Sequence, residues 1–173
     1  MKKVKLLSVL CIFLISQAVS GQQAMKQWDK WNFLVGEWAG EGNGQPGKGE
    51  GKFTFGFDLD GNILVRKSST HFPATATSKE INHDDLLIIY QPGNDGSHEA
   101  IYFDNEGHTI KYKVSFNDKS VVLTSGISAG EMRFRYTYTQ LDPKTIISSF
   151  EMASPQAPED FKMYLSGKSF KVK

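Results

Sequence analysis

Gly36-Glu37-Trp38-Ala39-Gly40-Glu41-Gly42 is the stretch of the sequence that decides the fold. Side chains of a β-strand alternate between its two faces, so Gly40 and Gly42 share a face with Trp38. A large ring followed by two missing side chains is typical of a strand that bends sharply and lies close against another segment. The stretch therefore predicts a curved β-strand that begins with a buried indole.

The residues that follow alternate between apolar and polar side chains, which indicates half-buried strands. The alternation is clearest in Phe53–Leu59, Ile110–Phe116 and Met132–Thr139. Further strands are expected at Ile63–Thr70, Leu86–Gln91, His98–Phe103, Val121–Ser125, Thr145–Met152 and Asp160–Leu165, and a turn at Ser166-Gly167 is expected to continue the last of them to Val172. Short turns rich in Gly, Asn and Asp separate most of the strands, and His71–Asn82 is expected to be a longer loop.

About ten strands joined by short turns predict an all-β protein with a single antiparallel up-and-down barrel. A Greek-key sandwich would need longer connections, and closure of the barrel also protects the edge strands. Helical spacing of Trp28, Trp31 and Leu34 predicts one short N-terminal helix at Ala24–Leu34. We expect this helix to cover one end of the barrel.

Residues 1–20 have the features of a secretory signal peptide. Three lysines precede the apolar run Leu6–Ile15, and Ala18-Val19-Ser20 has the small residues of a cleavage site. The run is too short to cross a membrane, since a spanning helix needs roughly 20 residues. The sequence predicts a periplasmic or secreted protein with one domain, residues 21–173, and no integral membrane segment after removal of the signal.

Composition excludes several classes of function. Loss of the signal leaves 17 of the 20 Lys and Arg side chains against 19 Asp and Glu. Because a nucleic-acid partner would require a clustered basic excess, we expect none. The single cysteine, Cys11, lies in the predicted signal, so the mature domain has no disulfide and no thiol chemistry.

Three motif matches are interpreted as turns. Gly126-Ile127-Ser128-Ala129-Gly130 has the G-x-S-x-G pattern of a nucleophile elbow, but a strand follows it where that motif needs a helix. Gly42–Lys48 resembles a phosphate-binding loop and is also followed by a strand. Asp58–Asn62 resembles the start of a calcium loop, without the glutamate that such a loop needs at its end. We therefore predict no catalytic residue from these motifs.

The histidines also fail to form a recognisable ligand set. His71, His83, His98 and His108 are assigned to separate loops and lack the spacing of metal ligands. The sequence predicts no metal and no cofactor.

The inner face of the predicted barrel collects aromatic side chains. A barrel of roughly eight to ten strands either fills with side chains or holds one small ligand. Aromatic walls with tyrosine hydroxyls suit a ligand that has an apolar body and a few polar atoms. We therefore expect a small, mostly apolar ligand inside the barrel, and the candidate ligand-binding residues are Phe55, Phe57, Tyr112, Phe134, Tyr136 and Tyr138.

Two other functions stay open at this point. The first is an enzyme that acts at the open rim with Arg66, His71 and neighbouring Ser and Thr residues, which requires a titratable pair within hydrogen-bond reach in the cavity. The second is a non-catalytic interaction module with a filled barrel, which requires a large apolar patch on the outer surface.

The segment Phe33–Gly42, with its G-x-W-x-G-x-G pattern after a short helix, resembles calycin-type barrels such as the lipocalins. It is most similar to nitrobindin-like barrels and to a related secreted bacterial family of unknown function. The resemblance covers Ala24 to the end of the chain and implies a calycin-like barrel in which Trp38 packs the closed end. Nitrobindins hold haem through a histidine near the C-terminus, and this sequence has no histidine after His108. The resemblance therefore does not imply haem binding.

Overall fold

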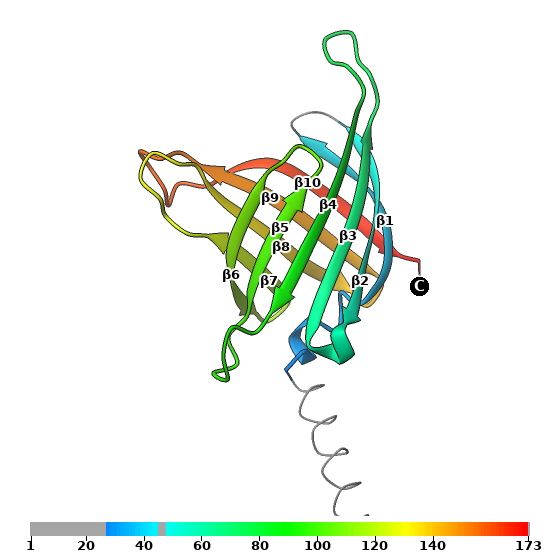
Figure 1. The fold of residues 1–173 in the computed structure, drawn as a ribbon. Coiled ribbons are helices and arrows are strands. Elements are labelled where there is room, and N and C mark those ends of the chain that lie inside the picture. Colours follow the sequence, from blue (N-terminus) through cyan, green and yellow to red (C-terminus); the bar gives the residue numbers. More distant parts are fainter. Residues whose placement is uncertain (1–26, 45–47, 173) are drawn as a thin grey trace, which may run out of the picture.

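The computed structural model describes residues 27–44 and 48–172, which form a closed antiparallel β-barrel (Figure 1). Each strand pairs with its neighbours along the chain, and the last strand pairs with the first to close the sheet. The predicted up-and-down barrel is thus confirmed. The predicted signal peptide lies outside the described residues.

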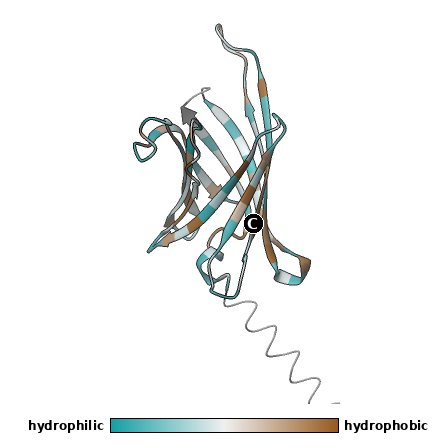
Figure 2. Ribbon diagram, turned by 60° about the vertical axis from the view of Figure 1, so that its left-hand side comes forward, coloured by the Kyte–Doolittle hydropathy of each residue, from teal (hydrophilic) through white to brown (hydrophobic). Residues whose placement is uncertain are grey.

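The described residues contain ten strands and two short 3₁₀ segments. The strands are β1 (Gly36–Gly44), β2 (Gly49–Asp58), β3 (Ile63–Phe72), β4 (Ile81–Tyr90), β5 (Glu99–Asp104), β6 (Thr109–Asn117), β7 (Ser120–Ser125), β8 (Arg133–Asp142), β9 (Thr145–Ala153) and β10 (Lys162–Lys171). The 3₁₀ segments are η1 (Asp29–Trp31) and η2 (Leu59–Gly61). Hydrophilic and hydrophobic residues alternate along the strands, as the sequence predicts (Figure 2).

Two predicted boundaries are wrong. The β3–β4 hairpin remains paired as far as Phe72 and Ile81, so both ends of the predicted loop His71–Asn82 belong to strands. Strand β10 also continues through Gly167 without a turn, because Gly167 pairs with Gly42 on one side and Ser148 on the other. In both places pairing with a neighbouring strand overrides the local preference of Ser, Thr and Gly for turns.

The predicted N-terminal helix is also wrong over the part that the structure describes. Residues 27–34 contain the 3₁₀ segment η1 and turns, while Ala24 and its two successors lie outside the described residues. Backbone bonds run from Trp31 N to Trp28 O and from Leu34 N to Trp31 O, both 2.8 Å long. A three-residue repeat of apolar side chains fits a 3₁₀ turn as well as an α-helix, which explains the error.

Neither η1 nor η2 is long or apolar enough to cross a membrane, and no other helix occurs in residues 27–44 and 48–172.

Segment η1 lies at one end of the barrel (Figure 1), and three buried indole rings pack in the core there. Trp28, Trp31 and Trp38 are at most 2% exposed, and Leu34 is fully buried among them. The Trp38 Nε1 donates to Leu34 O at 2.7 Å, and the Trp28 Nε1 donates to Gly61 O at 2.8 Å. The burial of Trp38 at the closed end, which the resemblance implied, is confirmed.

Glycines allow the strands on either side of β1 to approach closely. A Cβ on Gly40 would overlap Lys168 O of β10 and would lie 2.5 Å from the Ser169 Oγ. A Cβ on Gly167 would lie 2.9 Å from Glu41 O. Both strands therefore require glycine where the barrel closes, which confirms the close approach predicted from the alternating glycines of β1.

Replacement of Gly40 by alanine should destabilise the barrel, because the added methyl group meets backbone atoms that cannot rotate away. We expect Gly40→Ala to lower the free energy of unfolding by about 1–3 kcal/mol in urea titrations. Gly56→Ala is the matched control, since a Cβ there meets nothing within 4 Å. Equal stability of the two variants would contradict the glycine requirement.

Candidate functional site

A charged pair lies on the inner wall of the barrel. Arg66 of β3 follows Leu64 on the inward face, and Asp85 of β4 precedes the buried Leu87 on the same face. In the β3–β4 register Asp85 lies opposite Ser68, which makes it the diagonal neighbour of Arg66. The two side chains are only 4% and 6% exposed.

The guanidinium of Arg66 bridges two elements of the wall. Its Nη2 donates to Asp85 Oδ1, and its Nη1 donates to the Tyr138 Oη of β8. The Arg66 Cζ also lies 5.2 Å from the ring centroid of Tyr136, within the range of a cation–π contact. The pair is therefore held by ionic, hydrogen-bond and aromatic contacts together.

The surroundings keep the arginine charged and the phenols neutral. Burial alone would lower the pKa of Arg66, but the adjacent Asp85 and the tyrosines raise it well above its ordinary value. Burial raises the pKa of Tyr138 well above its ordinary value, and burial also raises the pKa of Tyr112. The site at neutral pH is an ion pair surrounded by neutral hydroxyl groups.

A cavity of about 80 Å³ adjoins the ion pair on the side of the glycine-rich strands. Arg66 and Tyr136 line it together with four hydroxyl groups and four apolar side chains, namely those of Ser68, Thr70, Ser148, Ser169, Phe53, Phe72, Phe150 and Leu165. The Arg66 Nε is buried and has no hydrogen-bond partner among the described residues. The cavity has room for water, but ligand pockets are usually larger, at roughly 300–1,000 Å³.

A second polar cluster lies on β4 and β5, toward the end of the barrel opposite the indoles. The His83 Nε2 lies 2.9 Å from the Tyr102 Oη, and that hydroxyl donates to Asp104 Oδ2 at 3.2 Å. His83 therefore sits within β4 and bonds to an inward-facing tyrosine of β5, so its assignment to a loop is wrong. His98 does lie just before β5, but it is only 5% exposed, and its ring lies 5.0 Å from the Trp28 ring between centroids.

Acidic and histidine side chains of the rim extend this second cluster. The His83 Nδ1 lies 3.0 Å from Glu106 Oε1, and the His108 Nδ1 lies 2.8 Å from Asp104 Oδ2. Burial would raise the pKa of Asp104, but hydrogen bonds from His108 and Tyr102 lower it below its ordinary value. Among residues 27–44 and 48–172, no group of three or more His, Cys, Asp or Glu side chains could hold a metal ion.

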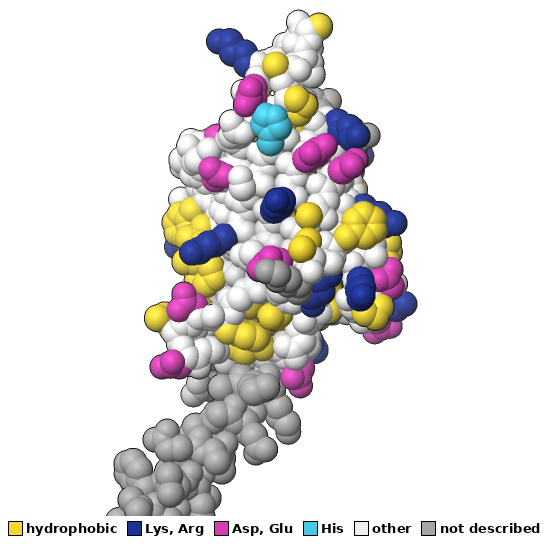
Figure 3. Space-filling model, turned by 90° about the vertical axis from the view of Figure 1, so that its right-hand side faces the viewer, with side chains coloured by type: hydrophobic (Ala, Val, Ile, Leu, Met, Phe, Trp, Pro, Cys, Tyr) yellow, Lys and Arg dark blue, Asp and Glu magenta, His cyan; other side chains and the backbone are white. Residues whose placement is uncertain are grey.

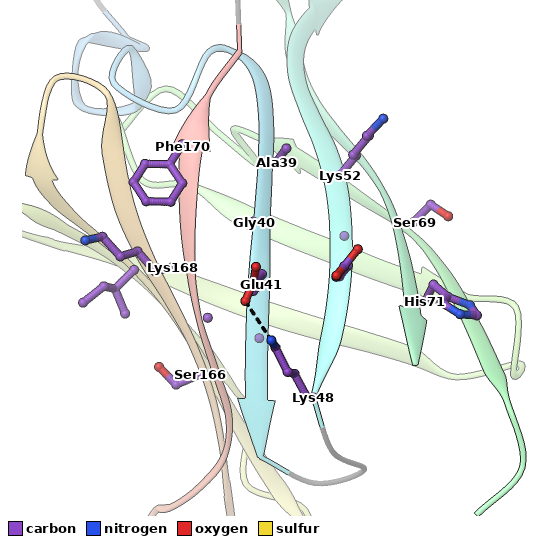
Figure 4. A pocket seen from close by; sticks show the side chains of 15 residues that line it. Ala39, Gly40, Glu41, Lys48, Lys52, Ser69, His71, Ser166, Lys168 and Phe170 are labelled. Carbon is purple, nitrogen blue, oxygen red and sulfur yellow. Dashed lines mark ion pairs between the residues drawn. The ribbon is translucent and has the colours of Figure 1, made fainter. Parts of the chain in front are cut away.

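A larger hollow of about 1120 Å³ lies on the outside of the wall, over β1, β2, β3 and β10 (Figure 4). Its charged lining includes Glu41 and Lys48, which form an exposed ion pair at 3.3 Å. His71, a residue of β3 and not of a loop, lines this outer hollow, whereas Arg66 is on the inner face of the same strand. The structure therefore does not bring together the two residues of the predicted rim enzyme.

The outer surface on this side of the molecule is mixed. On the face shown in Figure 3, hydrophobic side chains of the described residues lie in small groups between Lys, Arg, Asp and Glu. The exposed Phe170, at 53%, lines the outer hollow. The face in Figure 3 does not carry the large apolar patch that an interaction module requires.

Five of the six predicted ligand-binding residues occupy the barrel interior. Phe55, Tyr112 and Tyr138 are buried, and Phe134 and Tyr136 are half-buried. The rings of Phe55 and Tyr136 both contact the Tyr138 ring, at centroid distances of 5.3 and 4.8 Å. Phe57 is instead 43% exposed at the closed end, 5.8 Å from the Trp28 ring. Of the six, Tyr136 alone lines the 80 Å³ cavity.

Sequence reasoning missed the charge partner of Arg66 and several residues of the cavity wall. Asp85 alternates with Leu87 and Ile89, but the apolar residues between them hide which face points inward. Phe150 of β9 lies in a stretch without clear alternation, although its ring contacts that of Tyr136 at 6.0 Å. Only the strand register reveals these two positions.

No protein-family model matches the sequence, and no curated protein matches it significantly. Among solved structures, the chain is similar to the S-type phycobiliprotein lyase CPES from Guillardia theta, with a TM-score of 0.51 and 8% identity over 90% of this chain and 97% of that one. It is less similar to a de novo designed fluorescence-activating β-barrel, with a TM-score of 0.40 and 8% identity over 81% and 94% of the two chains. At these identities the first similarity shows a shared fold alone, and the second carries no argument.

Removal of one member of the ion pair should cost more than removal of both. Asp85→Leu leaves the buried Arg66 charge without its partner, so we expect a loss of about 3–5 kcal/mol in the free energy of unfolding. The double variant Arg66→Met/Asp85→Leu buries no charge and should recover most of that loss. Urea titrations at pH 7 measure both, and a double variant less stable than Asp85→Leu would contradict the ion pair.

Proposed function

We propose that the protein is an exported, calycin-like barrel that binds one small, mostly apolar molecule in the open half of its interior. The observation that carries this proposal is the cavity that Arg66 lines together with four hydroxyl groups and four apolar side chains. The closed half is packed around its indoles, since Trp31, Leu34 and Trp38 are at most 1% exposed.

The shape of the cavity wall sets the form of the ligand. Arg66 and hydroxyl groups such as that of Ser148 receive the polar end of the molecule, while Phe72 and Phe150 enclose its apolar body. Since the cavity measures about 80 Å³, a molecule of more than a few heavy atoms fits only when these rings rotate away.

Support for the calycin-like assignment is limited to the fold. The G-x-W-x-G-x-G segment opens β1 and its Trp38 packs the closed end, which agrees with the pattern of such barrels. The lyase with a similar fold shares 8% identity, so we transfer neither its activity nor its substrate to this chain. Export rests on residues 1–20 and stays a prediction.

A rim enzyme has weaker support. His83 and Tyr102 are a titratable pair within hydrogen-bond reach, but neither lines the 80 Å³ cavity. Burial also raises the pKa of Tyr102 far above its ordinary value, so its hydroxyl stays protonated at neutral pH and is a poor base or nucleophile. We therefore favour binding over catalysis.

A side chain that fills the cavity should weaken binding without unfolding the barrel. Probe binding can be followed by tryptophan emission, because the Trp38 ring stacks 6.2 Å from Phe53, which lines the cavity. We expect at least one member of an apolar dye and lipid library to give a saturable change. Ser148→Phe should weaken that binding by about tenfold or more, since a lost ligand contact of ~1.4 kcal/mol already gives that factor.

Ser149→Phe is the matched control. Ser148 and Phe150 line the cavity, whereas Ser149 lies between them on the other face of β9 and does not line it. It should bind the probe as the wild type does. Native mass spectrometry of protein purified from its own periplasm or medium then identifies any co-purified molecule. Absence of binding by every probe, or equal binding by both variants, would overturn the proposal and favour a filled interaction module.

A further inference from the structure

We infer that the bound molecule presents an uncharged oxygen acceptor, such as an amide or ester carbonyl, to the guanidinium of Arg66, and that free carboxylates are excluded. This inference rests on the proposed function, because it names the chemical class of the ligand of the same cavity.

The first argument is the count of donors on Arg66. Each Nη carries two N–H groups, and the structure gives Nη1 one bond to Tyr138 and Nη2 one bond to Asp85, so Arg66, which lines the cavity, retains further donors. A guanidinium nitrogen can only donate, so the group that completes this site must be an acceptor. A hydrogen bond from a charged guanidinium is stronger than one between neutral groups, which favours such an acceptor.

The second argument is the charge of the site. Asp85 already neutralises Arg66, and the inward-facing Asp104 lies directly opposite Asp85 in the β4–β5 register. Glu41 also borders the cavity, but its side chain is 64% exposed and pairs with Lys48 on the outer face. A carboxylate ligand would place a further buried negative charge beside Asp85 and share one guanidinium with it, which disfavours the ionised form.

The hydroxyl groups of the cavity do not alter this choice. Ser68, Thr70 and Ser148 can each donate or accept a hydrogen bond, so they accommodate a second polar atom of either kind. They cannot supply the positive charge that a second carboxylate would need. The class of ligand is therefore set by Arg66 and Asp85.

The test uses benzamide and benzoate, two probes of nearly the same shape that differ in charge at pH 7. Their binding to the purified protein is measured by isothermal titration calorimetry and by displacement of the best dye. We expect benzamide to bind about tenfold or more tightly than benzoate, the ratio expected when an unpaired charge enters a buried site.

Asp85→Asn keeps the shape of the side chain and removes its charge. We expect benzoate to gain about tenfold or more in this variant, since Arg66 then lacks a counter-charge. Asp84→Asn is the matched control, because Asp84 is exposed on the outer face of the same strand; it should leave both affinities unchanged. If Asp85→Asn does not fold, Asp85→Ser, which also removes the carboxylate charge, replaces it, and benzoate should gain there in the same way.

The outcomes separate this inference from the proposed function. If neither the benzene probes nor any dye binds the wild type, the proposed function itself is wrong. If benzoate binds the wild type as tightly as benzamide, and Ser148→Phe abolishes both, the cavity binds ligands but the inference is wrong. An unchanged ratio in the Asp85 variants would also overturn it.

Discussion

The charge of Arg66, buried on the inner wall of the barrel, imposes the strongest constraint on this structure. Removal of a guanidinium from water is costly unless an opposite charge and hydrogen-bond partners replace the lost hydration. Asp85 on the neighbouring strand supplies the charge, and Tyr138, 72 residues away along the chain, supplies a hydroxyl on another part of the wall. The ring of Tyr138 in turn packs on Phe55, so the polar site is joined to the aromatic core of the closed half.

The two halves of the barrel interior differ in their side chains: one half is packed with apolar groups, and the other has polar groups beside a cavity. At the closed end, indole rings and aliphatic side chains pack against one another, and His98 is buried as well. Beyond Arg66 the inner wall becomes polar, with serine and threonine on β3 and β9 and the histidine–tyrosine–carboxylate cluster near the rim. A core that served stability alone would gain from apolar side chains at these positions, since a buried ion pair is seldom more stabilising than its apolar replacement.

The glycines of the barrel seam connect the inner cavity with the outer hollow. Gly40, Gly42, Gly51 and Gly167 line both, so at this place the wall is one backbone thick. Strands without side chains can bend inward and approach each other, which hollows the outer surface and leaves space beside Phe53 and Phe150 inside. The same sequence feature thus closes the barrel and positions the cavity.

The sequence predicts most of the fold because the two-residue period is strong in β2, β6 and β8, and because Trp38 and its glycines identify the curved first strand. Prediction from the sequence fails where one pattern of apolar residues is compatible with two different structures. The three-residue spacing of Trp28 and Trp31 suits a 3₁₀ turn as well as an α-helix, and the apolar run of β4 conceals its inward face. The candidate site could be predicted only in part, because the contacts of Arg66 with Asp85 and Tyr138 depend on strand register and barrel closure, which single-residue patterns do not encode.

The burial of Arg66 can be measured directly by hydrogen exchange of its side chain in ¹⁵N-labelled protein. The chain has three arginines, Arg66, Arg133 and Arg135, so their Nε–H signals can be assigned by substitution of each in turn. Since the Arg135 side chain is 34% exposed and that of Arg66 only 4%, the account predicts that the Arg66 signal persists at pH values at which the Arg135 signal is lost to exchange with water. Exchange of Arg66 as fast as that of Arg135 would contradict a buried ion pair on the inner wall.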